Sequence, residues 1–315
     1  MVGVRIKQGI FYGSLLITTI MLFLLATASK ETSNVRDGYR FRSRKESTRQ
    51  KIIVITPTYP RPTRFADITR MATVLSQVPD VFWIVLEDRN TTVPLVDKII
   101  SRHVKDYMYF ACPTKNGFPA KGWYQRSTAL QVLKRQRQKI LGDFEKGVIY
   151  FGDDDNAYDR KLFNDYIANV RKIGVWAVAL VGGTAIESQQ VNENGKVEKY
   201  RVVWRPERPF AIDMAGFAVD MDTVLNSNAS FPPSCKIGFG APEPCFLHKL
   251  KITKEDLEPF GYGPEDDHQV LVWHTKAQQP RYKPKEIDLN GFEFEFLPPK
   301  PTTTTKKPLS TTKPT

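Results

Sequence analysis

Short apolar segments alternate with amphipathic segments along residues 51–183, and this order constrains the fold more than any other feature of the chain. Lys51–Ile55 and Val81–Leu86 are typical of buried strands, and Phe65–Val78 between them has apolar residues at helical spacing. Such alternation predicts an α/β protein with a largely parallel sheet that binds ligands at the carboxyl ends of its strands. The other elements expected in this part are helices over Pro94–His103, Tyr124–Leu141 and Arg160–Ile173, and strands over Tyr107–Ala111, from Val148 onward and over Val175–Val181.

The pattern changes in the second part of the core. Val191–Val197 contains an Asn-Gly pair and predicts a hairpin, and further strands are expected over Tyr200–Trp204 and Val270–Lys276. We therefore expect one globular unit with a nucleotide-binding half, residues 51–183, and an acceptor-facing half, residues 184–297.

Three consecutive aspartates, Asp153, Asp154 and Asp155, directly follow the apolar segment that starts at Val148. Like charges this close together are costly where the dielectric constant falls, and a bound divalent cation is the usual compensation. Hard oxygen ligands suit Mg²⁺ or Mn²⁺, which bridge to phosphate oxygens of a substrate. The alternative is an acidic loop that caps the helix expected from Arg160, but the apolar strand before the acids favours a site for a metal and a nucleotide.

Other polar residues also follow expected strand ends. Tyr59 comes after the first strand and Asp88 after the second, as Asp153–Asp155 come after the strand from Val148. Because the carboxyl ends of parallel strands meet at one edge of a sheet, these side chains should converge on one crevice.

The N-terminal part contains an uncharged apolar segment, Ile10–Ala28, of about the length that spans a bilayer as a helix. We expect an uncleaved signal anchor there, with a cytoplasmic tail over residues 1–9 and a basic stem over residues 29–50. Its Ala26–Ala28 end could also be a signal-peptidase site. A strict count of basic residues on either side of the span would place the C-terminal part in the cytosol.

Sites for glycosylation favour the opposite orientation. Asn90 and Asn228 begin Asn-x-Thr/Ser triplets, and the Thr/Pro-rich tail, residues 298–315, resembles an O-glycosylated extension. We therefore expect a type II membrane protein with its bulk in the secretory lumen.

The formal net charge of +12 lies almost entirely in the segment before Ile52 and in the tail after Leu297. The core between them is nearly neutral, so nucleic acid binding is not expected. The basic stem and tail could contact anionic lipid head groups or a polyanionic acceptor.

The three cysteines, Cys112, Cys235 and Cys245, are too few for a disulfide scaffold. Cys235 and Cys245 could close a small loop and leave Cys112 free. Three unpaired thiols are the alternative.

Several motifs follow one another in a fixed order: P-T-Y-x-R (Pro57–Arg61), W-x-x-x-E-D (Trp83–Asp88), Q-R-x-x-A-L (Gln125–Leu130), Y-F-x-D-D-D-N-x-Y (Tyr150–Tyr158), L-V-G-G (Leu180–Gly183), R-P-F-x-x-D-M-A-G-F-A-V (Arg208–Val219) and V-W-H-T (Val272–Thr275). On these motifs the chain resembles the inverting β1,3-glucuronyltransferases of the Golgi, which transfer glucuronic acid from UDP-glucuronate to a galactose-terminated acceptor. The resemblance covers nearly the whole core. It implies a GT-A-like fold, an Mn²⁺ cofactor, a luminal catalytic part anchored in the Golgi membrane, and a homodimer.

The resemblance also implies which residues bind the donor. Tyr59 would stack on the uracil and Asp88 would hold its edge, while Asp155 would coordinate Mn²⁺. The other expected donor contacts are Arg126 for its charge, Asp153 and Asp154 for the ribose and the sugar, and His274 for the diphosphate and the glucuronate.

On the acceptor side, the resemblance implies that Glu187, Arg208 and Asp213 bind the acceptor sugars and that Glu243 is the general base. Inverting transfer requires one carboxylate opposite the leaving group, because a group there must take the proton of the attacking 3-hydroxyl.

Each of these residues also has a structural interpretation. Glu243 lies between two prolines and could simply begin a helix. Asp213 and Arg208 could form an ion pair, and His274 could be a core histidine. Asp266, Asp267 and His268 could suggest a second metal site. Their Gly/Pro-rich setting is more typical of a solvated loop.

Two departures from the family concern charge and a loop. Lys121 and Lys276 stand where the family usually carries arginine, and lysine keeps the charge but loses bidentate recognition. We expect both lysines to contact the donor. The cysteine-bearing loop Pro232–Pro244 is unlike that of familiar members, which leaves the acceptor open between a proteoglycan linker, a glycoprotein glycan and a glycolipid.

The leading hypothesis is a membrane-anchored, Mn²⁺-dependent glucuronyltransferase. One alternative is the same fold transferring another UDP-sugar, and another is an inactive, lectin-like or scaffolding member. The intact Asp153–Asp155 and Glu243 argue against an inactive member, because an inactive protein has no physical reason to keep four destabilising carboxylates together.

Overall fold

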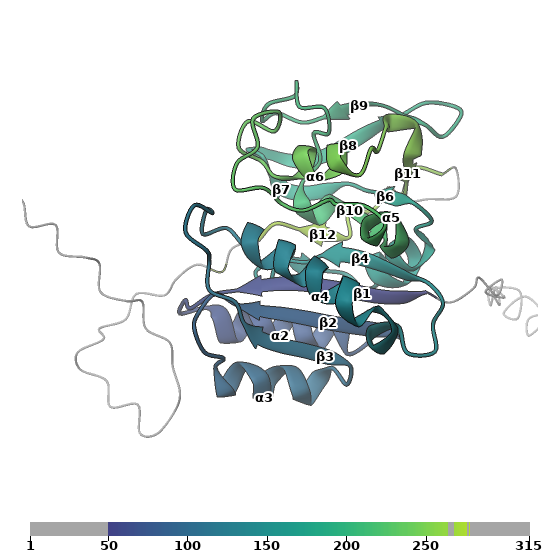
Figure 1. Ribbon diagram of the computed structural model, residues 1–315. Coiled ribbons are helices and arrows are strands. Elements are labelled where there is room, and N and C mark those ends of the chain that lie inside the picture. The colour runs from purple at the N-terminus through teal and green to yellow at the C-terminus, as the bar shows by residue number, and fades with distance from the viewer. Residues whose placement is uncertain (1–49, 264–267, 276, 278–315) are drawn as a thin grey trace, which may run out of the picture. The chain divides into compact units, whose positions relative to one another are not determined.

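The computed structural model describes residues 50–263, 268–275 and 277, all of which belong to one unit, Thr48–Thr315 (Figure 1). The predicted signal anchor with its flanking tail and stem, the Thr/Pro-rich tail, Lys276, Asp266 and Asp267 lie outside the described residues. Among those that are described, no helix is long and apolar enough to cross a membrane.

The larger sheet has seven strands in the order β11-β6-β10-β4-β1-β2-β3. Its strands are β1 (Lys51–Thr58), β2 (Val81–Glu87), β3 (Tyr107–Ala111), β4 (Gly147–Phe151), β6 (Ile173–Val175), β10 (Phe217–Asp220) and β11 (Leu257–Pro259). The pairs β1–β2, β2–β3, β1–β4 and β6–β11 are parallel, and only β10 runs antiparallel to its neighbours. The register pairs Thr58 with Glu87 and Ile55 with Phe151, so three parallel strands end at the same edge.

The smaller sheet has five strands in the order β5-β12-β7-β8-β9. These are β5 (Ala157–Tyr158), β12 (Val272–Trp273), β7 (Val178–Val181), β8 (Thr184–Val191) and β9 (Val197–Arg201). The predicted hairpin is confirmed, because β8 and β9 pair antiparallel across the Asn-Gly turn. Strand β12 lies between β7 and β5, which begins just after the aspartate triplet, so this sheet adjoins the acid-bearing edge of the larger one.

Helices cover both faces of the larger sheet. They are α2 (Arg64–Leu75), α3 (Pro94–His103), α4 (Trp123–Leu141), α5 (Met221–Leu225) and α6 (Glu243–Lys249). Side chains alternate along β1, as a strand requires: Ile53 and Ile55 pack with the α4, α5 and α6 side, whereas Ile52 and Val54 pack with α2 and α3. This two-sided burial explains why β1, β2 and β4 are continuous apolar runs.

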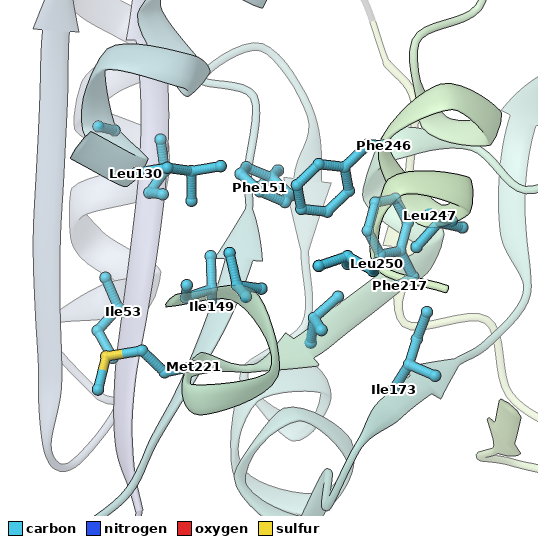
Figure 2. Close-up of a cluster of buried hydrophobic side chains, with 14 of the residues drawn as sticks. Ile53, Leu130, Ile149, Phe151, Ile173, Phe217, Met221, Phe246, Leu247 and Leu250 are labelled. Atoms are coloured by element: carbon cyan, nitrogen blue, oxygen red, sulfur yellow. The ribbon is translucent and has the colours of Figure 1, made fainter. Parts of the chain in front are cut away.

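An aromatic cluster joins α6 to the sheet. The ring of Phe246 lies 5.4 Å from that of Phe151 and stacks at 4.6 Å on that of Phe231. Figure 2 shows Phe246 and Phe151 pointing toward one another between α6 and the end of β4. These contacts anchor the first turn of α6 against the last residue of β4, two residues before the aspartate triplet begins.

The α/β prediction is confirmed, but four expected elements differ. The helix predicted over Arg160–Ile173 is confirmed only as far as Asn169 and is irregular, since it continues as a π-helix at Leu162–Tyr166 and a 3-10 turn at Ile167–Asn169, and Ile173 already begins β6. Such irregular turns have no simple periodicity in a sequence. The strand over Val175–Val181 is divided into β6 and β7, because the chain changes sheets at Trp176, whose indole donates to the carbonyl of Ala215 (2.9 Å).

The two remaining strand predictions were too long. The predicted strand Tyr200–Trp204 ends at Arg201, and Val203 and Trp204 lie exposed in the loop beyond it. Of the predicted strand Val270–Lys276, only Val272–Trp273 pairs in the described part. In the first case the apolar residues lie in a surface loop, and in the second they form only a short bridge between strands. A local sequence pattern does not distinguish either arrangement from a longer strand.

Candidate active site

A cavity of about 210 Å³ lies at the carboxyl ends of β1, β2 and β4. It is lined by Pro57, Thr58, Tyr59, Asp88, Ala120, Lys121, Gly122, Gln125, Arg126, Asp153, Asp154 and Asp155. The convergence predicted from the strand ends is thus confirmed, and Lys121 and Arg126 join it from the start of α4. Because the cavity combines an aromatic ring, cationic groups and carboxylates, it suits a charged nucleotide.

Tyr59 presents an open aromatic surface at this cavity. Its side chain is 53 % exposed, and the guanidinium of Arg61 lies 5.0 Å from the ring centroid. Arg61 is itself fixed by ion pairs to Asp67 and Asp154, each at 2.9 Å. Arg61 ends the P-T-Y-x-R motif, but its role beneath Tyr59 was not predicted from the sequence.

Asp154 is buried and held from two sides. Thr58 Oγ1 donates to its carboxylate (2.7 Å), and Arg61 pairs with it. Burial raises its pKa to about 6, in spite of the lowering effect of Arg61. The side chain of Asp154 therefore supports Arg61 beneath Tyr59, in addition to lining the cavity.

Arg126 and Asp153 form an ion pair across the cavity. One guanidinium nitrogen of Arg126 donates to Asp153, and another donates to the carbonyl of Lys121 (3.0 Å). Gly122 makes this possible, since it has φ +75° and an added Cβ would lie 2.7 Å from Pro57 and 2.9 Å from Arg126. Lys121 is exposed at the rim of the cavity.

Asp155 is held through its backbone. Its carbonyl accepts from Arg70 Nη2 (2.7 Å) and Thr275 Oγ1 (3.1 Å), whereas no described residue donates a hydrogen bond to its carboxylate. Burial and the neighbouring charge of Asp153 raise its pKa. A cation at this carboxylate would relieve both effects.

In the described part of the chain, no three His, Cys, Asp or Glu side chains lie close enough to hold a metal ion by themselves. Mg²⁺ and similar hard cations are commonly bound by one or two carboxylates together with substrate phosphates and water. The carboxylate of Asp155, which lines the cavity and receives no hydrogen bond from a described residue, fits that mode of binding. It does not fit a dedicated protein cage.

Asp88 fixes the wall of the cavity formed by the loop after β3. Its carboxylate accepts from the backbone N–H of Thr114 (2.6 Å) and from Thr114 Oγ1 (2.7 Å), and Gln125 Nε2 donates to the same hydroxyl (3.0 Å). Two of its lone-pair directions are thus occupied by the protein, which positions the carboxylate at the cavity edge.

Glu243 is the first residue of α6 and is only 6 % exposed. Its Oε2 is buried and has no hydrogen-bond partner among the described residues. Burial, together with the negative charge of Asp213, raises its pKa to about 8. Glu243 also begins a helix, as its structural interpretation predicted. Beginning a helix does not by itself explain why one carboxylate oxygen is buried without a hydrogen-bond donor among the described residues.

Glu187 is a second buried carboxylate in this region. It lies on β8 and is 5 % exposed; its Oε1 has no partner in the described part, and burial raises its pKa. Gly182 (φ +62°) is required beside it, because an added Cβ would lie 1.9 Å from Glu187 Oε1. Gly182 belongs to the L-V-G-G motif, but the motif alone does not reveal this contact with Glu187.

Arg208 does not pair with Asp213 in the described contacts. Its guanidinium donates to the carbonyls of Arg205 (3.2 Å) and Trp204 (3.3 Å) and lies 4.5 Å from the Trp204 ring centroid. Asp213 instead accepts from the backbone of Ala215 (2.9 Å). Arg208 thus offers a positive charge next to an aromatic ring.

His274 acts electrostatically on two carboxylates, Asp155 in the cavity and Asp213 in the region of Glu243. Its backbone N–H donates to Ala179 (2.9 Å), and its side chain is partly exposed rather than part of the core. Burial raises the pKa of Asp213, while His274 lowers it; His274 also lowers the pKa of Asp155. One histidine therefore influences both the cavity and the region of Glu243.

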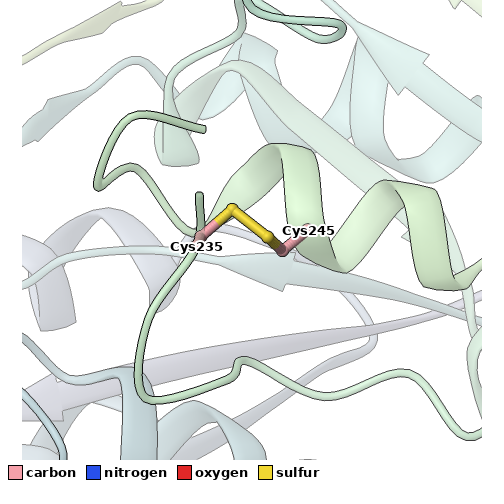
Figure 3. Close-up of a disulfide and its surroundings, with 2 residues drawn as sticks. All are labelled: Cys235 and Cys245. Atoms are coloured by element: carbon pink, nitrogen blue, oxygen red, sulfur yellow. A yellow bond between two sulfur atoms is a disulfide. The ribbon is translucent and has the colours of Figure 1, made fainter. Parts of the chain in front are cut away.

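The surface features predicted from the sequence are partly described. Asn90 and Asn228 are both exposed, as an acceptor asparagine must be. Cys235 and Cys245 form a disulfide with 5.8 Å between their Cα atoms (Figure 3). Cys112 is free and buried. The closed-loop alternative is therefore confirmed.

Comparison with known proteins places these motifs in one family. The profile of Glycosyltransferase family 43 matches residues 71–278. The galactosylgalactosylxylosylprotein 3-beta-glucuronosyltransferase sqv-8 of Caenorhabditis elegans is 36% identical over 81% of this chain and 72% of its own length. Galactosylgalactosylxylosylprotein 3-beta-glucuronosyltransferase 1 of Homo sapiens is 36% identical over 73% of this chain and 70% of its length. Among solved structures, S. aureus TarS 1-349 aligns with a TM-score of 0.45 and 15% identity, over 71% of this chain and 60% of that one.

Proposed function

This chain belongs to glycosyltransferase family 43, and we propose that it transfers glucuronic acid from UDP-glucuronate to the 3-hydroxyl of a terminal galactose, with inversion at the anomeric carbon. The names of its relatives support the donor sugar and the acceptor class. The observation that carries the proposal is Glu243, a buried carboxylate with an oxygen that no described residue hydrogen-bonds, whose pKa is influenced by Arg126 of the cavity at the strand ends.

The donor binds in the cavity at the strand ends. The exposed ring of Tyr59 stacks on the uracil, supported from below by Arg61, and Asp88 accepts from the edge of the base. Arg126 and Lys121 offset the charge of the diphosphate and the glucuronate, and His274, directly after β12, contacts the same groups. The carboxylates Asp153 and Asp154 hold the ribose and the sugar hydroxyls.

Asp155 would hold the divalent cation at the diphosphate end of the donor. When bound, Mn²⁺ stabilises the negative charge that develops on the UDP leaving group. The support for this assignment is the carboxylate of Asp155, which receives no hydrogen bond from a described residue and whose pKa is raised by burial and by Asp153.

Glu243 acts as the general base. In an in-line displacement the acceptor hydroxyl attacks from the side opposite UDP and loses its proton as the new bond forms. Burial raises the pKa of Glu243 to about 8, so its ionised form is a stronger base than an ordinary carboxylate, and that ionised form accepts the proton. Glu187, Arg208 and Asp213 hydrogen-bond the acceptor sugars and place the 3-hydroxyl at Glu243.

The protein works in the lumen of the secretory pathway, anchored in the Golgi membrane, and forms a homodimer. The disulfide between Cys235 and Cys245 supports an oxidising compartment. The exposed positions of Asn90 and Asn228 support the luminal orientation, since both could accept glycans.

A donor panel tests this proposal. The protein is assayed with UDP-glucuronate, UDP-glucose, UDP-galactose and UDP-N-acetylglucosamine against a β-galactoside, with and without Mn²⁺. We expect transfer from UDP-glucuronate to exceed all others. Faster transfer from a neutral UDP-sugar would instead support the alternative donor. Lys121 gives a physical reason for that outcome, because it stands where the resemblance implies an arginine, and lysine cannot bind a carboxylate in a bidentate manner.

A further inference from the structure

The disulfide between Cys235 and Cys245 joins a loop to the helical turn that carries the proposed base (Figure 3). Cys245 is the third residue of α6 and Glu243 is the first, so both lie in one turn. Cys235 lies outside the helix and is buried. The covalent bond therefore ties the first turn of α6 to a buried residue ten positions earlier in the chain.

The segment between the two cysteines is folded tightly. The backbone N–H of Gly240 donates to the carbonyl of Cys235 (3.1 Å), and that of Ala241 donates to the carbonyl of Gly238 (2.9 Å). Gly238 has no room for a side chain, since an added Cβ would lie 2.1 Å from the carbonyl oxygen of Ala241 and 2.9 Å from Cys235 Sγ. The segment thus packs directly against the disulfide as far as Ala241, and the N-cap of α6, Pro242, follows.

The position of the Glu243 carboxylate depends on the backbone that carries it. Its buried Oε2 has no hydrogen-bond partner among the described residues. A helix of seven residues is not stable in isolation, so contacts with its surroundings must fix its first turn. The ring of Phe246 supplies one such contact by packing against Phe151 and Phe231, and the disulfide supplies another at Cys245, the residue before Phe246.

We propose that Cys235 and Cys245 are positioning residues for the transfer step, because their disulfide holds the first turn of α6 where Glu243 can reach the acceptor hydroxyl. This inference rests on the proposed function, in which Glu243 is the general base. Neither sulfur atom takes part in the reaction. A misplacement of about 1 Å at a reacting group can slow a reaction on the order of 100-fold, so a small shift of this turn is sufficient to affect the rate.

The first measurement compares wild type with the double variant Cys235→Ala/Cys245→Ala in single-turnover transfer of glucuronate to a β-galactoside. We expect the rate of the double variant to be about 10- to 100-fold lower, because its base is misplaced. The Kd for UDP should be unchanged, since the described residues that line the donor cavity include none from 235–245. A wild-type rate, or a parallel loss of UDP binding, would overturn the inference.

A double-mutant cycle separates positioning of Glu243 from a general structural effect. The two cysteine substitutions are also made in Glu243→Gln, which has no base to position. If the disulfide acts through Glu243, its removal in this background should change the single-turnover rate by less than about twofold. Equal slowing in both backgrounds would mean that the disulfide only stabilises the fold, and would overturn the inference.

A second variant keeps the disulfide and tests the same turn. Gly238→Ala displaces the carbonyl of Ala241, two residues before Glu243, so it should also lower the single-turnover rate at unchanged Kd for UDP. Gly195→Ala is the control, because its added Cβ in the exposed hairpin turn would meet nothing within 4 Å. If the cysteine variant does not fold, Gly238→Ala decides, and a wild-type rate in it contradicts the positioning role.

The wild-type protein separates the two proposals. Absence of transfer from UDP-glucuronate by the wild type would contradict the proposed function. Transfer by the wild type, strong slowing in Glu243→Gln and equal effects of the cysteine substitutions in both backgrounds would contradict the positioning role of the disulfide alone.

Discussion

Arg126 donates a hydrogen bond to Asp153, so two side chains that were expected to bind the donor separately form a single ion pair. The guanidinium is almost fully buried, whereas the side chain of Asp153 is 30% exposed. Donor binding at this place therefore depends on the pair as a unit. A substitution of either residue also disturbs the other.

The first prediction concerns this pair. Arg126→Ala and Asp153→Asn should each weaken UDP binding, and the double variant should lose less than the sum of the two single losses. For residues in direct contact, the interaction energy is on the order of 0.5–3 kcal/mol. Calorimetric titration of UDP into all four proteins measures it, and strictly additive losses would show that the two residues act independently.

Gly182 and Glu187 provide the second prediction. Gly182→Ala would place a methyl group where Glu187 Oε1 now lies, so KM for the acceptor should rise while UDP binding stays intact. Gly183→Ala is a matched control, because Gly183 has φ +79° and its added Cβ would meet nothing within 4 Å. Both variants carry similar backbone strain, about 1–2 kcal/mol for alanine in the left-handed region. An equal loss of acceptor affinity in both would mean that strain, rather than displacement of Glu187, is the cause.

A third prediction concerns stability against pH. The pKa of Glu243 is about 8 in the folded protein and 4.5 in the unfolded one, so the folded protein binds the proton more tightly between these values. The stability that this proton contributes is fully present below pH 4.5 and is lost as the pH rises toward 8. Glu243→Gln cannot ionise, so at pH 8 its free energy of unfolding should exceed that of the wild type by about 1–3 kcal/mol.

Urea unfolding at pH 5, 7 and 8 checks this. The difference between Glu243→Gln and wild type should grow with pH, whereas Glu193→Gln, on the exposed hairpin turn, should follow the wild type throughout. A constant difference across the three pH values would mean that Glu243 is not held in an ionisation-sensitive environment.

The fourth prediction concerns the cation. In wild type, Mn²⁺ should strengthen UDP binding, and Asp155→Asn should abolish that increment while leaving the metal-free affinity for UDP nearly unchanged. The exposed Asp165→Asn serves as the control. UDP titrations with Mn²⁺ and with a chelator give the answer without any measurement of turnover. An unchanged increment in Asp155→Asn would move the cation to another carboxylate.

Local patterns in the sequence predicted the elements of the larger sheet well. Helix α3 and strand β3 have the predicted bounds, because Pro94 marks the first turn of the helix and five apolar residues make up the strand. The crevice was also predictable, because parallel strands place Tyr59 and Asp88 at one edge whatever the loops do.

Contacts between loops were not predictable from local patterns. The pairs Arg61–Asp154 and Arg205–Phe239 join residues far apart in the sequence, and nothing in the local composition indicates either contact. The division of the expected strand at Trp176 has the same origin, since the indole of Trp176 is held by the distant carbonyl of Ala215. Such features depend on tertiary packing, which overrides local preference.

The central claim is that Glu243 removes the proton from the acceptor hydroxyl during transfer from UDP-glucuronate. The most direct measurement is the single-turnover rate of glucuronate transfer to a β-galactoside by wild type and by Glu243→Gln, together with the Kd of each for UDP. We predict a rate lower by about 10²–10⁴ in the variant, the usual contribution of a positioned base, with an unchanged Kd. A variant that transfers glucuronate at nearly the wild-type rate would contradict the account.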